Sequence, residues 1–451
     1  MELPSLLLES LREIKGFNKD AFEKIHASGR QVTSIRFNPF KFSVSAEAFS
    51  EGEDWGEVLW ADHCYYLNQR PSFTFDPLFH AGCYYVQEAS SMFIEQALRQ
   101  TVDLSKALKV LDLCASPGGK STHIQSLISK DSLLVSNEVI RSRANVLKDN
   151  IIKWGCENVM VTNNDPKDFT KLENYFDVIV VDAPCSGSGL FRRDPDAIAE
   201  WSENNVQLCS QRQQRILADV WPALKKDGIL VYSTCSYSKE EDEDIVNWLT
   251  QEFAIDHLPL TIDSHWGIVE SSGGYRFWPD KVKGEGFFLA CFKKKDGEEQ
   301  RTGKIKREIT ALTNKEKVFV ANWINPEGKC LLRHETTVYA WPARLKDDFS
   351  FLLNNLRVIY SGVEAGGLMR DKMIPCHALA MTNLINNAIP RVELTKEEAI
   401  QYLKKKELNR EIINKGWQLV TYKGHSLGWI NVLQGRINNY YPKELRILRD
   451  N

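Results

Sequence analysis

The sequence contains no apolar run that approaches the roughly 20 residues needed to cross a bilayer, so a membrane-spanning helix is excluded. The first 20 residues also lack the continuous apolar stretch and small-residue cleavage site of a secretion signal, and they alternate apolar with charged side chains. This alternation predicts an amphipathic helix over residues 1–20. We expect a cytoplasmic protein with no membrane partner.

None of the ten cysteines forms a Cys-x-x-Cys pair, the spacing on which zinc ribbons and knuckles are built, so no metal site is predicted. In a reducing cytoplasm the thiols stay free, and most such cysteines are small buried hydrophobes. Only Cys185 and Cys235 have neighbours that argue for another role. Both follow predicted buried strands, in loops rich in Gly, Ser and Pro.

No internal repeat or low-complexity tract is present, and 43% hydrophobic with 26% charged residues is typical of an ordered protein. A chain of 451 residues exceeds one core and predicts two to four domains. Residues 301–451 hold 25 Lys and Arg against 15 Asp and Glu, whereas residues 1–300 hold 32 against 45. A basic C-terminal third favours a nucleic-acid partner, although solvated surfaces also carry charge.

From about residue 105 onward, short apolar runs alternate with helical patterns, which are clearest over residues 140–153 and 206–224. Near-continuous apolar strands separated by helices indicate a parallel sheet that is covered on both faces. This is an α/β architecture. The predicted strands are residues 107–113, 133–136, 159–162, 178–181 and 229–233.

The segments on either side of this core have different patterns. Residues 34–39 predict a strand closed by a proline turn, and residues 87–92 predict the start of a helix. Residues 293–308 are charged, contain glycine and show no apolar period, which predicts a linker. A capping box predicts a helix over residues 395–408, and residues 417–433 predict a hairpin.

Residues 112–120, Asp-Leu-Cys-Ala-Ser-Pro-Gly-Gly-Lys, follow a predicted buried strand and precede a helix. Glycines let the backbone approach a ligand at the carboxyl end of a strand, and the amino end of a helix favours an anionic group. A phosphate-binding P-loop would need its first glycine where Cys114 stands, and the dinucleotide fingerprint Gly-x-Gly-x-x-Gly is absent. A purely structural turn is the alternative.

Three acidic residues, Glu138, Asp165 and Asp182, follow successive strands of the predicted sheet. Parallel strands end at the same edge, so these side chains are expected near the glycine loop. There Glu138 can accept hydrogen bonds from both ribose hydroxyls, and Asp165 can accept one from an adenine amino group. A single acid after a strand is usually a helix cap, but three in succession predict a site for a nucleoside-bearing cofactor.

Cys185 and Cys235 follow neighbouring predicted strands and are expected at the same edge. A thiolate that adds to C6 of cytosine makes C5 able to accept a methyl group, which is a use of covalent catalysis. One cysteine would attack and the other would remove the C5 proton, and the spacing does not decide which. Asp182, protonated or sharing a proton at N3, would offset charge on the ring. Two structural cysteines are the alternative.

The chain resembles the Sun/Nol/Nop family of RNA cytosine-5 methyltransferases in residues 85–92, 112–120, 182–189, 233–242, 276–279 and 284–288. These stretches together cover about residues 30–295. The resemblance implies a class I methyltransferase fold, which is Rossmann-like with a mostly parallel seven-stranded sheet. It also implies S-adenosylmethionine as the cofactor.

By this resemblance, Cys235 is the nucleophile, Cys185 assists release of the product, and Asp182 acts on the base. Ser116 departs from the family pattern, in which alanine is common, but one small side chain replaces another. The residues that the resemblance assigns to S-adenosylmethionine are Cys114, Ala115, Ser116, Pro117, Gly118, Gly119, Lys120, Glu138, Asp165 and Asp182.

The tail is similar to that of bacterial 16S rRNA (cytosine-5) methyltransferases of the F type, which end in a PUA-like β-barrel, on the strength of Gly428-Trp429 and residues 438–442. We expect a monomer that methylates 16S rRNA, free or in the small ribosomal subunit. A tRNA cytosine-5 methyltransferase, or a ribosome-assembly RNA-binding factor with secondary methylation, is the alternative. The expected domains are an α+β RNA-contacting region (1–100), the methyltransferase core (101–295), a first C-terminal α+β module (309–392) and a PUA-like RNA-binding module (393–451).

Overall fold

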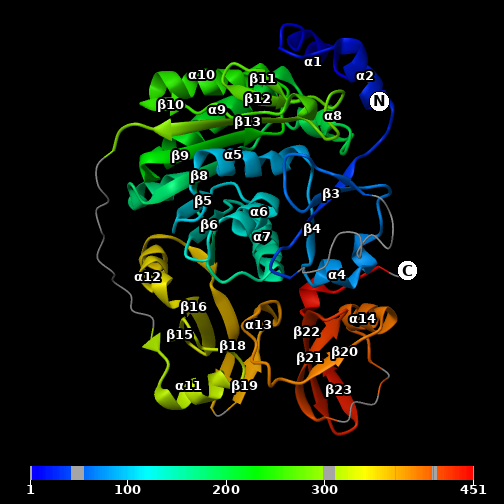
Figure 1. Cartoon of the computed structure of the whole chain (residues 1–451), viewed down its shortest axis with the longest axis vertical. Helices are drawn as coiled ribbons and strands as arrows, with labels where there is room; N and C mark the ends of the chain where they lie inside the picture. The colour runs from blue at the N-terminus through cyan, green and yellow to red at the C-terminus, as the bar shows by residue number, and fades with distance from the viewer. Residues whose placement is uncertain are drawn as a thin grey trace.

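The computed structural model describes residues 3–41, 55–297, 310–370, 372–408, 410 and 414–449 (Figure 1). At its centre lies a ten-stranded sheet whose middle strands are parallel. The predicted seven-stranded class I core is present in the order β7-β6-β5-β8-β9-β13-β12, in which β13 runs antiparallel to both of its neighbours. Its strands are β5 (Lys109–Asp112), β6 (Leu133–Asn137), β7 (Val159–Thr162), β8 (Phe176–Asp182), β9 (Leu224–Thr234), β12 (Gly274–Phe277) and β13 (Phe287–Lys294). The added strands are β10 (Ile255–His257), β11 (Val269–Ser271) and β17 (Val358–Ser361).

The central strands are apolar along their whole length because helices cover both faces of the sheet. Val110, Val178 and Val180 point into one apolar cluster, while their strand neighbours Leu111 and Ile179 point into another. The first cluster is covered by α5 (Ile94–Thr101), α6 (Gly119–Leu127) and α7 (Arg141–Trp154), and the second by α9 (Glu203–Val220) and α10 (Glu243–Glu252).

The N-terminal region differs from the sequence prediction at two helices. The single helix expected over residues 1–20 is two helices, α1 (Ser5–Ser10) and α2 (Lys19–Ala27). Gly16 separates them with a φ of +86°, a left-handed conformation that a helix cannot contain. The helix expected from residue 87 begins later, with a 3-10 turn at Ser90–Phe93 that leads into α5. This region also forms a sheet in the order β2 (Gly56–Glu57), β3 (Cys64–Leu67), β1 (Thr33–Phe37) and β4 (Tyr84–Val86).

Residues 310–375 form a second, five-stranded sheet, but one of their strands joins the core. That strand, β17, pairs antiparallel with β7 at the edge of the central sheet. The predicted linker at 293–308 begins inside β13, and its residues 298–308 lie outside the described residues. The second sheet is β14 (Thr310–Ala311), β15 (Lys329–His334), β16 (Thr337–Pro342), β18 (Val363–Met369) and β19 (Lys372–Pro375).

The last module has the predicted capping box at Thr395 and the predicted hairpin between β21 (Gly416–Tyr422) and β22 (His425–Leu433). Helix α14 (Lys396–Leu403) is shorter than expected, because Lys405 has a left-handed φ of +57°. The remaining strands are β20 (Arg391–Glu393) and β23 (Arg436–Asn439). This module packs on the N-terminal region beside α4 (Pro77–His80), so the two ends of the chain share one apolar cluster (Figure 1).

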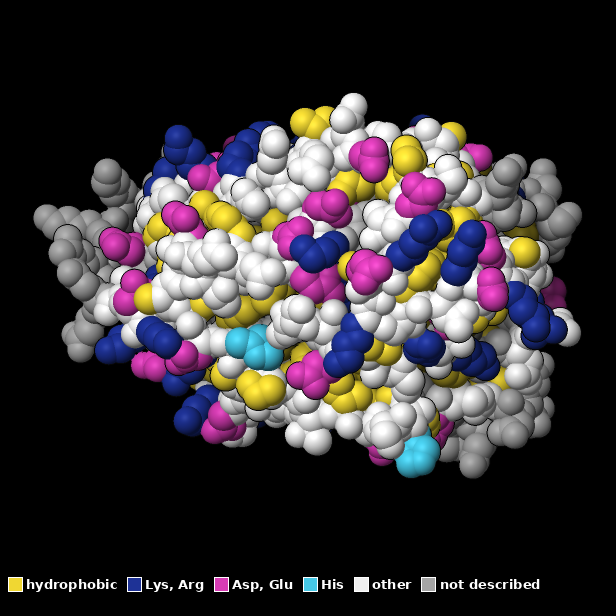
Figure 2. Space-filling model, turned by 90° about the horizontal axis from the view of Figure 1, so that it is seen from above, with side chains coloured by type: hydrophobic (Ala, Val, Ile, Leu, Met, Phe, Trp, Pro, Cys, Tyr) yellow, Lys and Arg dark blue, Asp and Glu magenta, His cyan; other side chains and the backbone are white. Residues whose placement is uncertain are grey.

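The outer face of the methyltransferase end, opposite the C-terminal modules, carries Lys and Arg side chains interspersed with Asp and Glu (Figure 2). No single sign of charge dominates that face. Among the described residues, no helix is both long enough and apolar enough to span a membrane.

Candidate active site

The loop after β5 carries the predicted cofactor residues into α6. Gly118 has a φ of +112°, in the left-handed region that favours glycine, and immediately precedes the first residue of α6. A Cβ at this position would lie 3.3 Å from Cδ1 of Leu147 on α7. Asn150, also on α7, donates a hydrogen bond to the Pro117 carbonyl at 2.8 Å. The turn is therefore fixed against α7.

A cavity of about 270 Å³ lies at the carboxyl ends of β5, β8 and β9. It brings together the predicted cofactor loop, Asp182 and Cys235. Four predicted residues, Gly118, Cys185, Glu138 and Asp165, are outside its lining. The sequence analysis assigned no role to the residues contributed by β4 and by the loop before β13. The lining consists of Tyr85, Val86, Gln87, Glu88, Ser91, Cys114, Ala115, Ser116, Pro117, Gly119, Lys120, Asp182, Leu190, Arg193, Cys235, Gly286 and Phe287.

Lys120 and Asp182 form an ion pair in this cavity. Nζ of Lys120 lies 2.8 Å from Oδ2 of Asp182, and Ser233 donates a hydrogen bond to Oδ1 at 2.8 Å. Burial is the largest single effect on the pKa of Lys120 and lowers it, but the charge and hydrogen bond of Asp182, together with Cys235 and Asp112, raise the pKa overall. Lys120 is thus a cation that pairs with Asp182.

The two predicted cysteines are in contact. Their Sγ atoms are 3.0 Å apart, well beyond a disulfide of about 2.05 Å and within hydrogen-bonding reach. They meet because Cys185 follows β8, Cys235 follows β9, and these strands pair in parallel. The hydrogen bond to Cys235, together with burial, raises the pKa of Cys185 well above its ordinary value. Cys185 is therefore held as a thiol, in hydrogen-bonding contact with the sulfur of Cys235.

Glu241 holds both cysteine loops, a role that the sequence analysis missed. Its carboxylate accepts hydrogen bonds from the backbone N–H of Ser186 at 2.8 Å and from the hydroxyls of Ser186 at 2.5 Å and Ser236 at 2.6 Å. Burial raises the pKa of Glu241, against the effect of these hydrogen bonds. Glu241 ends a 3-10 turn, Lys239–Glu241, that leads into α10. Glu241 lies within the stretch 233–242 that resembles the family, but no role was predicted for its carboxylate.

Glu138 and Asp165 lie at the predicted edge of the sheet, after β6 and β7. Glu138 is buried, accepts a hydrogen bond from the N–H of Ile140 at 2.9 Å, and lies 3.5 Å from Nε of Arg143. Asp165 is half exposed and accepts a hydrogen bond from the N–H of Lys167 at 3.1 Å. Both carboxylates cap local turns through one of their oxygen atoms. The remaining lone pairs of each carboxylate can accept hydrogen bonds from a ligand that extends along this edge of the sheet beyond the cavity.

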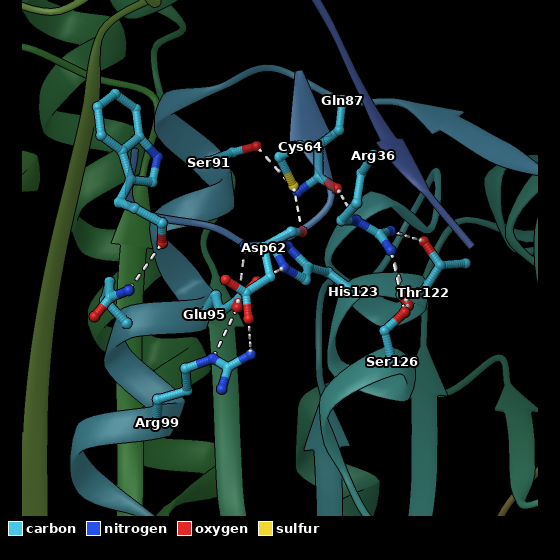
Figure 3. A network of polar contacts seen from close by, with 12 residues as sticks. Arg36, Asp62, Cys64, Gln87, Ser91, Glu95, Arg99, Thr122, His123 and Ser126 are labelled. Atoms are coloured by element: carbon cyan, nitrogen blue, oxygen red, sulfur yellow. Dashed lines mark hydrogen bonds and ion pairs between the residues drawn. The ribbon is translucent and has the colours of Figure 1, made fainter. Parts of the chain in front are cut away.

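Arg36, on β1 of the N-terminal region, points toward Thr122 and Ser126 of the cofactor helix (Figure 3). It is 1% exposed and donates hydrogen bonds to the Gly119 carbonyl at 3.2 Å and to the Thr122 hydroxyl at 2.7 Å. Its Nε donates to Oε1 of Gln87 at 3.0 Å, and Gln87 lines the cavity. Burial lowers the pKa of Arg36 to about 10, so it remains charged at neutral pH. No sequence motif marked this residue.

Three family models together match most of the chain. That of the 16S rRNA methyltransferase RsmB/F matches residues 99–293. The N-terminal domain of the 16S rRNA methyltransferase RsmF matches residues 3–89, and the methyltransferase RsmF PUA domain matches residues 389–447. A solved structure, a methyltransferase homolog protein from Pyrococcus horikoshii, is 26% identical with a TM-score of 0.53, over 65% of this chain and 100% of that one.

Curated relatives match over nearly the whole length. The ribosomal RNA small subunit methyltransferase F of Vibrio parahaemolyticus is 30% identical over 98% of this chain and 97% of the relative. That of Psychromonas ingrahamii is 31% identical over 93% of this chain and 91% of the relative. Similarity of this extent, on a class I fold whose glycine loop and Cys235 line one cavity, shows that the chain belongs to the ribosomal RNA small subunit methyltransferase F family and is an S-adenosylmethionine-dependent RNA methyltransferase.

Proposed function

We propose that this enzyme methylates C5 of a cytosine in 16S rRNA through a transient bond between Cys235 and C6 of the base. The observation that carries the proposal is the pair of thiols, 3.0 Å apart, at a cavity lined by the glycine loop and Asp182. A sulfur nucleophile is needed where the methylated carbon is not itself nucleophilic. Methylation of a nitrogen or oxygen would not require it.

S-adenosylmethionine supplies, when bound, a methyl group on a sulfonium ion. The residues present suit its polar groups. The Lys120 ammonium and the amino end of α6 favour a carboxylate, and Glu138 and Asp165 are acceptors of the kind that ribose hydroxyls and an adenine amino group need. We assign cofactor binding to residues 114–120 together with Glu138, Asp165 and Asp182.

The state of the thiol pair supports Cys235 as the nucleophile. The Cys235 thiolate adds to C6, the electron pair moves to C5, and C5 takes the methyl group. The pKa of Cys185 is raised first of all by its hydrogen bond to Cys235. When the sulfur of Cys235 is bonded to carbon, that hydrogen bond weakens, and Cys185 can release its proton to solvent. The Cys185 thiolate then removes the C5 proton, and the C6–S bond breaks to restore the ring and the Cys235 thiolate.

The Lys120–Asp182 pair is placed to offset charge on the ring. Addition of sulfur to C6 increases electron density at N3, and a proton shared with N3 stabilises that state. The Lys120 ammonium, 2.8 Å from Oδ2 of Asp182, keeps a positive charge beside the group that would share this proton with N3.

RNA binding is assigned to the two ends of the chain, residues 1–100 and 393–451, which share one apolar cluster. The core at 101–295 carries the chemistry, and residues 309–392 connect it to the last module. We propose that the enzyme acts as a monomer, in the cytoplasm, on 16S rRNA or on the small subunit that contains it.

The covalent route is tested by incubating variants with RNA and cofactor and resolving the products on a denaturing gel. Cys185→Ala is expected to accumulate a protein–RNA adduct, because the C5 proton is not removed, whereas Cys235→Ala forms none. Cys209→Ala, which removes a buried thiol on α9, serves as the control and should turn over without accumulating adduct. Accumulation in Cys235→Ala alone would exchange the two roles, and no adduct in any variant would refute the route.

The substrate is tested by bisulfite sequencing of 16S rRNA and tRNA from a deletion strain. The proposal expects a 5-methylcytosine to disappear from 16S rRNA and to return with the wild-type gene but not with Cys235→Ala. Loss from tRNA instead would make the enzyme a tRNA methyltransferase. Restored growth with Cys235→Ala, in the absence of the mark, would make assembly of the ribosome its main role.

A further inference from the structure

A second cavity, of about 190 Å³, adjoins the active-site cavity and takes no part in the chemistry proposed above. The two cavities share four lining residues, Val86, Gln87, Glu88 and Arg193, and therefore meet at the end of β4. The other residues that line the second cavity are Gln31, Val32, Thr33, Ser34, Arg70 and Glu285.

The two carboxylates of the second cavity are already engaged by the protein. Glu88 accepts hydrogen bonds from the N–H groups of Ser90 at 2.9 Å, Ser91 at 2.8 Å and Glu285 at 2.8 Å. The side chain of Glu285 is buried, which raises its pKa to about 7, and it lies 3.8 Å from Nη1 of Arg192. Glu88 thus joins two loops, and the raised pKa of Glu285 favours its neutral form, so these acids oppose an anion in the cavity less than their formal charge suggests.

The two exposed arginines of the cavity differ from Arg192. Arg192 is buried and donates hydrogen bonds to the carbonyls of Gly284 at 3.0 Å and Arg30 at 2.8 Å. Within the described ranges, the guanidinium groups of Arg193 and Arg70 have no hydrogen bond or ion pair, and Arg70 lies over the ring of Phe73 at 5.2 Å. Both groups keep their donors available, and Arg193 stands where the two cavities join.

A cytosine held in the active-site cavity is part of a strand, so an anionic phosphodiester must lie at the mouth of that cavity. Guanidinium groups bind phosphate oxygens through two parallel hydrogen bonds. We propose that the second cavity receives the RNA nucleotide adjacent to the target cytosine and that Arg193 binds the phosphodiester between the two. The inference rests on the proposed function, and it adds a subsite for single-stranded RNA whose polar lining, including Gln31 and Thr33, faces the sugar hydroxyls.

The first test compares Arg193→Gln with Arg193→Lys and with Arg212→Gln, which removes an exposed arginine on α9 and serves as the control. Loss of one charge-assisted contact should raise KM for 16S rRNA about tenfold, with kcat within about twofold of wild type and the lysine variant between the two. The slope of log Kd against log salt should fall by about 1. Unchanged KM and salt slope overturn the proposal, as does a loss confined to kcat.

The second test uses short single-stranded RNAs in which one phosphate beside the mapped cytosine is a neutral methylphosphonate. Binding is measured with Cys235→Ala enzyme, so the result does not depend on whether the covalent route is correct. A neutral linkage on one side should weaken binding, and combining it with Arg193→Gln should add nothing further. Fully additive losses on both sides overturn the contact between Arg193 and that phosphate.

Discussion

Glu241 is the residue whose single carboxylate determines the distance between two sulfur atoms. It accepts hydrogen bonds from Ser186, next to Cys185, and from Ser236, next to Cys235. Gln213 adds a fourth hydrogen bond at 3.2 Å. Because each bond needs an acceptor, the ionised form holds both loops and the protonated form holds them less well.

Glu241→Gln is expected to lower kcat by about tenfold to a hundredfold, because small displacements of reacting groups are costly. The pH profile separates this positioning role from a loss of folding. The pKa of Glu241 is raised by burial, so wild-type activity should fall on the acid side as Glu241 takes up a proton, and the glutamine variant should lack that limb. Kinetics across pH measure this, with thermal unfolding as a check on the fold. The control Glu240→Gln should match wild type; identical pH profiles for all three enzymes would contradict the role.

At the scale of elements, the cofactor helix α6 is held by a strand from another part of the chain. Arg36 on β1 donates to the Gly119 carbonyl and the Thr122 hydroxyl, at the first turn of α6 (Figure 3). Its guanidinium also lies over the ring of Trp154 at 4.6 Å. The N-terminal region therefore supports the cofactor helix through Arg36, in addition to lining the cavity with residues of β4 and the segment that follows it.

Arg36→Met should weaken S-adenosylmethionine binding by about tenfold or more and lower the unfolding temperature, because buried carbonyls left without a donor cost about 1–3 kcal/mol each. Calorimetric titration and thermal unfolding measure the two effects. Lys293→Gln provides the control, since Lys293 is 42% exposed in its ion pair with Asp227 and such pairs contribute about 0–1 kcal/mol. Unchanged cofactor affinity in a destabilised Arg36→Met enzyme would limit this arginine to a role in folding.

At the scale of the whole molecule, the last module is part of the N-terminal core. Ile35 and Leu78 from the N-terminal region and Tyr402 and Ile430 from the last module belong to one apolar cluster. Strand β17 similarly ties the preceding module to the core sheet. The C-terminal third, although basic, therefore stabilises the protein as well as offering charge to RNA.

These two contributions can be separated. Arg436→Gln combined with Lys443→Gln, both exposed, should reduce the salt slope of RNA binding by about 2 and leave the unfolding temperature unchanged. Deleting residues 390–451 should lower the unfolding temperature as well, because it exposes the shared cluster. Filter binding across salt concentrations and thermal unfolding test both. Binding by the full chain that does not vary with salt would remove the electrostatic explanation of the charge asymmetry.

Local sequence predicted strands and loops correctly where a short segment is enough to define them. The apolar runs predicted all five parallel strands, and the glycine loop and both cysteines were assigned to one sheet edge before their distances were known. Helix ends were less accurate, because Gly16 and Lys405 adopt left-handed conformations that periodicity does not reveal. Glu241 and Arg36 were missed because their partners are distant in the sequence, 55 residues away for Ser186 and 86 for Thr122.

The order of residues in the chain was enough to indicate an α/β fold with a glycine loop for a nucleoside-bearing cofactor and two candidate sulfur nucleophiles, since strand periodicity and motif spacing are local properties. The resemblance to a known family added the methyltransferase activity. The order of residues did not establish which cysteine is held as a protonated thiol, which carboxylate fixes the pair, or that β1 supports α6. Those features depend on burial and on hydrogen bonds between segments, and a buried charge or thiol has its pKa set by neighbours that only folding brings together.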